Sequence, residues 1–349
     1  MKKITYKDAG VNIDAGNEAV VRIKKLAKTT YSKNIISDIG SFAALIDLQE
    51  IIRQYQHPVL VQSIDGVGTK TIIAKLMKKY TTLGADLLSA SCNDILVVGA
   101  KPLTMLDYIA SDRLEPDIIE QLITGMVNAC CENDVSLVGG ETAEMPKVYF
   151  AHEHDLVGIV TGIVEKDQII NGNAIEIGDK VLGLSSSGLH TNGYSLARKL
   201  FLEVAAFSVD KIIPEISQEH TLGEILLMPH INYTKPILDL LGIIKVKGMA
   251  HITGGGLLEN IPRILPANCT AQINTKAWTV PAVFKTLQKI GNLSLEEMCR
   301  TFNMGIGYVL IVRAEDAAMV LKFMQKYQHI FKAVIIGEII SGVRKVNLI

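Results

Sequence analysis

The segment "PVLVQSIDGVGTKT", residues 58–71, decides the fold class. Its first residues are β-branched or apolar and favour a strand. The run "IIAKLMKKY" at 72–80 follows and favours a helix. Glycines, an acid, hydroxyls and a lysine stand between the two, where α/β sheets bind their ligands. The segment therefore predicts an α/β protein with a phosphate-handling loop at a strand end.

This loop is not a P-loop, because the chain contains no Gly-Lys dipeptide, and it contains no G-x-G-x-x-G segment. Two interpretations remain. In the first, Asp65 binds a metal ion, while Thr69, Lys70 and the backbone of two glycines contact phosphates. The glycines are Gly66 and Gly68. In the second, the segment is a tight turn with an N-capping hydroxyl. The packing of acid, hydroxyl and lysine together favours the first.

Composition narrows the function classes. The 349 residues predict about two domains, and 48% hydrophobic with 5% aromatic residues fits an aliphatic α/β interior. A net charge of −1 gives no general attraction to nucleic acid or to anionic membranes. No apolar run is long enough to span a bilayer, and "MKKITYKDAG" lacks the apolar core of a signal peptide. Five cysteines without a C-x-x-C pair predict buried free thiols in the cytoplasm.

The strand and helix pattern occurs twice, and a Gly/Asn-rich connector, "IINGNAIEIGD", lies between the two occurrences. We therefore expect domains at 1–170 and 171–349. The stretch before residue 40 is polar and has no strong pattern. Expected strands lie at 103–110, 155–166, 305–312 and 332–340, the last being the final strand; expected helices lie at 84–100, 115–134 and 314–327.

Three acids occur in apolar elements or at strand ends. Asn93 and Asp94 interrupt the apolar helix 84–100, where an unpartnered carboxylate would be costly. Glu141 follows an expected Gly-Gly turn in "VGGETAEM". Together with Asp65 they have the composition of a carboxylate site for Mg²⁺ and ATP. The alternative for Asp94 is a structural hydrogen bond to a neighbouring helix.

Two polar loops in the second half complete the pattern. "SSSGLHTNGYSLAR" at 185–198 places Ser187, His190 and Asn192 before a helix, where a sugar phosphate could bind; an N-capping loop is the alternative. "HITGGGLLENIPR" at 251–263 offers glycine amides to an anion, and a hinge is the alternative.

These segments, in this order, resemble those of the phosphoribosylformylglycinamidine cyclo-ligases, also called aminoimidazole ribonucleotide synthetases. The resemblance begins at "YKDAGVNIDAGN", residues 6–17, and extends to "TFNMGIGYVLIV", residues 301–312. It implies a two-domain α/β fold with mixed sheets, whose N-terminal domains pair through their sheets in a homodimer. It also implies an ATP-dependent ring closure in purine biosynthesis, from formylglycinamidine ribonucleotide (FGAM) to aminoimidazole ribonucleotide (AIR).

The resemblance further implies roles for individual residues. Asp65, Asp94 and Glu141 would hold Mg²⁺ and the ATP phosphates, with Lys24, Gly66, Gly68, Thr69, Lys70 and Asn93 around the nucleotide. Ser187, His190 and Asn192 would contact the substrate, and Gly254, Gly255 and Gly256 its phosphate. Asp65, Lys70 and His190 would be catalytic, while His190 and His251 are candidates for proton transfer by residue type.

One loop departs from the family pattern. Where the family often has "GGFGAL", this chain has "GSFAAL" at 40–45, so Ser41 and Ala43 replace glycines and make positive φ costlier. Related ATP enzymes are the main rivals: selenophosphate synthetase, thiamine-monophosphate kinase and the amidotransferase-coupled synthetase. The first cysteine, Cys92, lies in an apolar helix, which argues against selenophosphate synthetase. A non-catalytic nucleotide-binding protein would be expected to lack the acid set.

Overall fold

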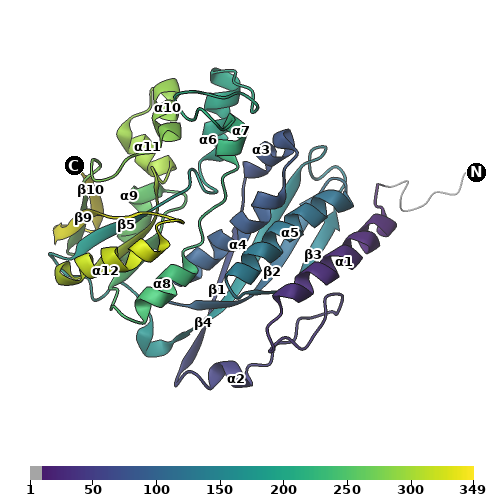
Figure 1. Ribbon diagram of the computed structural model, residues 1–349, viewed down its shortest axis with the longest axis horizontal. Coiled ribbons are helices and arrows are strands. Elements are labelled where there is room, and N and C mark those ends of the chain that lie inside the picture. The colour runs from purple at the N-terminus through teal and green to yellow at the C-terminus, as the bar shows by residue number, and fades with distance from the viewer. Residues whose placement is uncertain (1–9) are drawn as a thin grey trace, which may run out of the picture. The chain divides into compact units, whose positions relative to one another are not determined.

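The computed structural model describes residues 10–349 (Figure 1). The start of the "YKDAGVNIDAGN" segment, residues 6–9, lies outside this part. The chain forms two compact units. The first contains the chain up to Ile95 and Lys101–Asp167; the second contains Leu96–Ala100 and Gln168–Ile349. The main passage between units at 167/168 is close to the expected boundary at 170/171, but the short piece at 96–100 was not foreseen.

The first unit contains a four-stranded mixed sheet in the order β1-β4-β2-β3. β4 is antiparallel to both β1 and β2, whereas β2 and β3 are parallel. The strands are β1 (Pro58–Gly66), β2 (Lys101–Ser111), β3 (Ser136–Glu144) and β4 (His154–Glu165); the helices are α1 (Ile13–Ala27), α2 (Gln49–Ile52), α3 (Lys70–Met77), α4 (Thr81–Leu96) and α5 (Pro116–Glu132). The elements expected over 58–166 are therefore confirmed, with shifted ends.

Helices cover one face of this sheet (Figure 1). α4 and α5 approach closely because Gly84 and Gly125 have no side chain at their contact. A Cβ on Gly84 would lie 2.1 Å from the Leu122 carbonyl oxygen, and one on Gly125 would lie 1.7 Å from the Thr81 carbonyl oxygen. α1 packs beside α5, where Arg22 pairs with acids of α5. Within the polar stretch before residue 40, α1 occupies 13–27 because its apolar residues dock on α5.

The other face of the sheet is apolar and exposed. Side chains of a strand alternate between faces, so Ile64 of β1, Ile159 of β4 and Leu106 of β2 form one row across the sheet. Ile64 is 66% and Leu106 38% exposed, and Leu60 on the same side of β1 is 58% exposed. This surface, which we call the open face, is continuous over three strands.

The second unit contains a six-stranded mixed sheet in the order β10-β7-β9-β5-β8-β6. Two apolar clusters pack against it, one including Leu182, Tyr308 and Leu310 and the other Val181, Val309 and Ile311, so both faces are covered near β5 and β8. The strands are β5 (Lys180–Ser185), β6 (Gly248–His251), β7 (Cys269–Ile273), β8 (Ile306–Val312), β9 (Ala333–Ser341) and β10 (Lys345–Leu348). The helices are α6 (Tyr194–Arg198), α7 (Leu222–Leu226), α8 (Thr234–Leu241), α9 (Gly256–Asn260), α10 (Ala282–Gly291), α11 (Leu295–Thr301) and α12 (Ala317–Met324).

Three expectations about local structure were wrong. Gly139 and Gly140 do not form a turn but lie inside β3, where they pair with β2. Gly140 is opposite Asp107 of β2, and a Cβ on Gly140 would be 2.3 Å from an oxygen of that residue, so the close approach requires glycine. The strand at 333–341 is not the last, since β10 follows it. Cys131 is exposed, while the other four cysteines are buried. Over residues 10–349, no helix combines the length and apolar character needed to cross a membrane.

Candidate functional site

The loop between β1 and α3 has the expected form. β1 ends at Gly66 and α3 begins at Lys70, with Thr69 as its N-cap residue. Gly68 has φ +54°, in the left-handed region that favours glycine. The amide of Gly66 donates to Asp65 Oδ1 at 2.7 Å, so the carboxylate already satisfies that amide. Half-buried Thr69 and the exposed Gly68 remain accessible to a ligand.

Lys70 does not face this loop. Its side chain is 0% exposed, and Nζ lies 2.7 Å from Oδ2 of Asp86 in α4, which is also 0% exposed. Burial lowers the pKa of Lys70, and the charge of Asp86 opposes that change. The expectation of a direct contact between Lys70 and phosphate is therefore corrected: a fully buried ammonium paired with an internal carboxylate holds α3 against α4.

Asp65 and Asp94 lie on the same, helix-covered side of the sheet. Ser63 Oγ donates to Asp94 Oδ2 at 3.1 Å, and Asp65 follows Ser63 by two residues, on the same face of β1. Both carboxylates are half-buried, whereas Asn93 is 0% exposed. Two accessible carboxylates with oxygen-only chemistry fit a hard cation such as Mg²⁺.

Glu141 lies elsewhere. It shares a row with Tyr108, Val157 and Gly66, so it is three strands away from β1, roughly 14 Å at the usual strand spacing. It is also on the open face, because it points opposite to Gly140, which faces Asp107. Within one chain these three acids do not converge, and the described residues hold no group of three His, Cys, Asp or Glu that could bind a metal ion.

Lys24 is at the surface of the first unit. Its Nζ lies 3.4 Å from Oδ2 of Asp38, and Lys28 lies 3.0 Å from the other oxygen. Hydrogen bonds from Lys28 and then Lys24 lower the pKa of Asp38. These contacts place Lys24 near the "GSFAAL" loop. In that loop only Gly40 has positive φ, so Ser41 and Ala43 do not carry the strain that their side chains would bring.

Asp107 was not among the acids that the sequence pattern indicated. Asp107 lies on β2 on the helix-covered side, 8% exposed, and burial raises its pKa to about 7. Asp107 is the one acidic residue in the apolar run "LTMLDYIA", which was the available signal. The strand pattern alone did not show which face of the sheet its side chain lies on.

In the second unit, the loop after β5 and the loop after β6 come together. A Cβ on Gly254 would lie 3.6 Å from Oδ1 of Asn192, so the two predicted substrate loops are neighbours. Ser187 Oγ donates to the Pro229 carbonyl at 2.5 Å, and its amide donates to His190 Nε2 at 3.3 Å. His190 itself is 0% exposed, with φ +60°.

The three glycines have different roles. Gly254 is exposed, and Gly255 has φ +93° at the start of α9. Gly256 is buried, its amide donates to the Thr253 carbonyl at 2.9 Å, and a Cβ there would lie 2.0 Å from the Cys299 carbonyl oxygen. The expected phosphate contact is therefore corrected for Gly256, whose amide is used within the turn; Gly254 and Gly255 remain candidates.

His230 was missed entirely. It lies between α7 and α8, 3% exposed, and its ring stacks on His190 with centroids 4.0 Å apart. Its Nε2 lies 3.0 Å from Nε2 of His251, the last residue of β6. The segment "MPHINYT" has no motif that could have revealed this, because the contacts join three loops distant in sequence.

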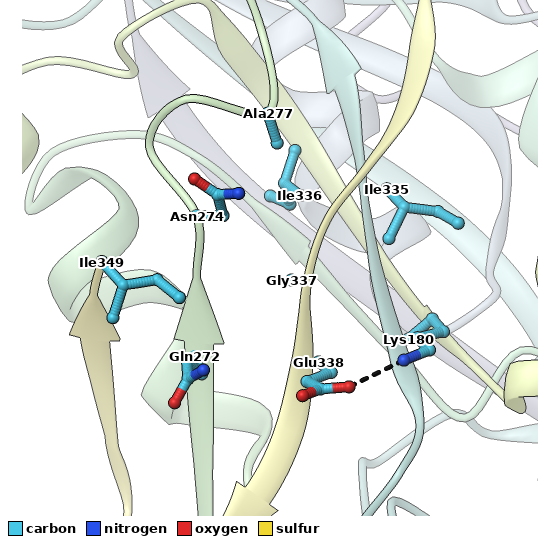
Figure 2. Close-up of a pocket in the computed structure, with 9 residues that line it drawn as sticks. All are labelled: Lys180, Gln272, Asn274, Ala277, Ile335, Ile336, Gly337, Glu338 and Ile349. Atoms are coloured by element: carbon cyan, nitrogen blue, oxygen red, sulfur yellow. Dashed lines mark hydrogen bonds and ion pairs between the residues drawn. The ribbon is translucent and has the colours of Figure 1, made fainter.

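A cavity of about 250 Å³ opens over β5, β7 and β9 of the second unit (Figure 2). Lys180 and Glu338 face each other across neighbouring strands and form an ion pair of 2.7 Å, and Gln272 is the next residue in that row. None of the residues expected from sequence to bind ATP or substrate lines this cavity, so it does not belong to the candidate site.

Family models identify the class of protein to which the chain is similar. The N-terminal domain of the AIR synthase related proteins matches residues 41–164, and the C-terminal domain of the same class matches 176–347. Solved structures share the fold: thiamine-monophosphate kinase from Stenotrophomonas maltophilia (TM-score 0.68, 17% identity, 95% of each chain) and the hydrogenase maturation protein HypE of E. coli (0.65, 19%, 93% of this chain and 92% of that one). At these identities the likeness concerns the fold alone.

Closer relatives are curated phosphoribosylformylglycinamidine cyclo-ligases. The protein of Carboxydothermus hydrogenoformans is 47% identical over 346 residues, covering 99% of both chains. That of Caldanaerobacter subterraneus is 49% identical over 337 residues, covering 97% of this chain and 98% of the relative. The chain belongs to the family of phosphoribosylformylglycinamidine cyclo-ligases.

Proposed function

We propose that this protein converts FGAM and ATP into AIR, ADP and phosphate, the ring closure expected in purine biosynthesis. The observation that carries the proposal is 47% identity to a cyclo-ligase over 99% of both chains. The juxtaposition of the two substrate loops at Asn192 and Gly254 supports it. We further propose that the reaction takes place in the cytoplasm.

The chemistry explains the need for ATP. An amide oxygen is a poor leaving group, so transfer of the γ-phosphoryl group to the formamide oxygen converts it into phosphate, a good one. An amidine nitrogen then attacks the formamide carbon, loses a proton, and the carbon–oxygen bond breaks as phosphate leaves. The protein contributes positioning and charge neutralisation, as in other phosphoryl transfers.

ATP would bind at the carboxyl end of β1. Asp65 and Asp94 would hold Mg²⁺, which neutralises phosphate charge when it is bound. Thr69 and the backbone of Gly68 would contact the phosphates, where the exposed loop bends at φ +54°. Lys70 would act indirectly, because its ion pair with Asp86 holds α3 against α4. Lys24 and Asn93 would lie at the periphery, one at the surface and the other buried beside Asp94.

The open face and the two edge strands of the first unit support a homodimer. β1 and β3 are the two edges of the four-stranded sheet, and Asp65 and Glu141 lie on these opposite edges. The open face is apolar, and contiguous exposed apolar patches mark interaction surfaces. If two copies pair through their open faces and close into a barrel, β1 of one copy adjoins β3 of the other, and closure removes the exposed edges. The strand that carries Glu141 in a second copy would then lie beside the strand that carries Asp65, with the Glu141 side chain on the inner, open face.

Two loops of the second unit would bind the substrate. Ser187 and Asn192 would contact the ribonucleotide, and the amides of Gly254 and Gly255 its phosphate. His190 has a defined tautomer: a backbone amide can only donate, so Nε2 accepts from Ser187 and the proton of the neutral ring is on Nδ1. His190 would therefore offer a hydrogen-bond donor rather than a proton acceptor at Nδ1.

The test is a direct assay. Purified protein with FGAM and Mg²⁺–ATP should form AIR, with one ADP and one phosphate for each AIR. Thiamine monophosphate, the substrate named by a structural neighbour, is the control and should give no ADP above background. Turnover of thiamine monophosphate with no AIR formed would assign the protein to a different reaction.

A further inference from the structure

Three buried imidazoles contact one another in the second unit. The ring of His230 stacks on His190 at 4.0 Å between centroids, with an angle of 21° between the planes. On its other side, its Nε2 lies 3.0 Å from Nε2 of His251. The three side chains are 0%, 3% and 5% exposed in the order His190, His230, His251. His230 is thus the centre of the group.

Hydrogen-bond chemistry limits the charge of this group. Two imidazole nitrogens at 3.0 Å form a hydrogen bond only when one carries a proton and the other does not. His230 and His251 therefore carry at most one positive charge between them. His190 is neutral in this geometry, because its Nε2 accepts from the Ser187 amide. The three rings together hold at most one extra proton.

A hydroxyl and two phenols also lie near the three rings. His230 Nδ1 lies 3.3 Å from the hydroxyl of Thr191, which can donate or accept. Tyr308 packs near His251, with ring centroids 6.2 Å apart, and Tyr233 near His190, at 6.3 Å. Burial raises the pKa of Tyr233 well above its usual value, so that phenol stays neutral.

The space around the His190 ring is narrow on the side of β8. A Cβ on Gly307 would lie 2.4 Å from His190 Cε1 and 2.3 Å from the hydroxyl of Tyr233. The His190 ring is thus confined between Gly307 of β8 and the ring of His230. Loss of the stacking ring would leave His190 free to change rotamer.

We propose that His230 is a positioning residue for the ring closure: it shares one proton with His251 and clamps the neutral ring of His190. The inference rests on the proposed function for its catalytic meaning. With His230 as acceptor, a proton taken up by His251 is held in a charge-assisted hydrogen bond, which is stronger than a neutral one. His251 then accepts the proton that the attacking amidine nitrogen loses, and no charge is placed on His190.

Two variants separate the stack from the shared proton. His230→Phe keeps an aromatic ring against His190 but removes both nitrogens. His230→Gln removes the ring but offers an oxygen that can accept from His251. His329→Gln changes an exposed histidine and is the matched control. The pH dependence of kcat/KM is measured for each, together with the melting temperature.

For the wild type we expect a limb that rises with pH as the shared proton is lost. In His230→Phe this limb should move to lower pH, since the protonated form loses its charge-assisted bond. His230→Gln should restore the wild-type midpoint but lower kcat, because the clamp on His190 is lost. His329→Gln should leave the profile unchanged. A wild-type midpoint in His230→Phe would overturn the proposal.

A second measurement needs neither substrate nor a variant that folds. In ligand-free protein with ¹⁵N-labelled histidine, long-range ¹H–¹⁵N spectra report which nitrogen of each ring carries the proton. We expect His190 to be protonated at Nδ1 alone and one proton to be shared between the Nε2 atoms of His230 and His251. Two fully protonated rings in this pair at pH 7 would overturn the proposal whatever the assay for AIR gives.

Discussion

Lys70 and Asp86 form an ion pair inside the first unit, with Nζ 2.7 Å from Oδ2 and neither side chain exposed. The pair joins the first turn of α3, which follows the loop at Gly66–Thr69, to α4, which carries Asp94. Burial lowers the pKa of Lys70 and Asp86 counteracts it, so each charge depends on the other. The geometry of the loop at Gly66–Thr69 therefore depends on a contact outside the site.

Removal of one partner should destabilise the protein strongly. Lys70→Met leaves the Asp86 carboxylate buried without its cation, and we expect a loss of about 3–5 kcal/mol in the free energy of unfolding. The double variant Lys70→Met with Asp86→Leu should recover most of this loss, because no buried charge remains. Urea unfolding of the three proteins measures both effects.

Lys75→Met is the matched control, since Lys75 pairs with Glu153 at the surface and should cost less than about 1 kcal/mol. The double variant should also have reduced kcat, because α3 loses its tie to α4. Equal losses from the Lys70 and Lys75 substitutions would show that the buried pair is not special.

Asp107 should make stability depend on pH. Its pKa is about 7 in the folded protein against 3.8 ordinarily. Between pH 4 and 7 the unfolded chain is therefore ionised while the folded one keeps its proton, so stability falls as pH rises through this window, by up to about 4 kcal/mol. Asp107→Asn should flatten this part of the profile. Between pH 4 and pH 8 the variant should therefore lose less stability than the wild type loses.

The measurement is the urea midpoint from pH 4 to pH 8 for both proteins. Asp134→Asn, on an exposed residue, should keep the wild-type slope. Parallel profiles for wild type and Asp107→Asn would contradict the assignment of the raised pKa to this carboxyl.

The open face should carry the dimer contact. Ile64→Glu places a charge among exposed apolar side chains of β1, and we expect the protein to sediment as a monomer. Leu76→Glu alters a side chain of α3 that is 50% exposed, and it should leave a dimer. A wild-type protein that sediments as a monomer at micromolar concentration would contradict the pairing of the open faces.

A mixing experiment tests whether the carboxylates of one site come from two chains. Asp94→Asn and Glu141→Gln should each lower kcat much more than they lower stability. If Glu141 of one copy completes the site of the other, a mixed dimer contains one doubly altered site and one intact site. Equal mixing should then restore about a quarter of wild-type activity.

The control for mixing is the double variant with both changes in one chain. Mixed with either single variant, it should restore no activity, because every resulting site keeps at least one change. Absence of recovery in the Asp94→Asn and Glu141→Gln mixture, with chain exchange verified, would contradict a site that takes carboxylates from two chains.

Sequence reasoning was sufficient where structure is local. The strand, glycine loop and helix around Asp65 and Thr69 follow from neighbouring residues, and the two polar loops of the second unit are contiguous motifs. It failed where tertiary contacts decide. Lys70 directly follows the glycine loop in sequence, but the direction of its helix turns the ammonium toward Asp86.

Glu141 and His230 show the same limit in other forms. The position of Glu141 depends on strand order, because β4 and β2 lie between β3 and β1, and no pattern in the sequence gives that order. His230 acquires its role from the meeting of three loops, so its own neighbours in sequence carry no signal.

The central claim is that phosphate leaves with the formamide oxygen of FGAM, and isotope transfer tests it most directly. FGAM labelled with ¹⁸O at the formyl oxygen is converted by the wild-type protein with Mg²⁺–ATP, and the released phosphate is analysed by ³¹P NMR or mass spectrometry. We predict one ¹⁸O atom in each phosphate formed together with AIR. Unlabelled phosphate released in equal amount with AIR would contradict the account, since ATP would then be hydrolysed without activating the formamide.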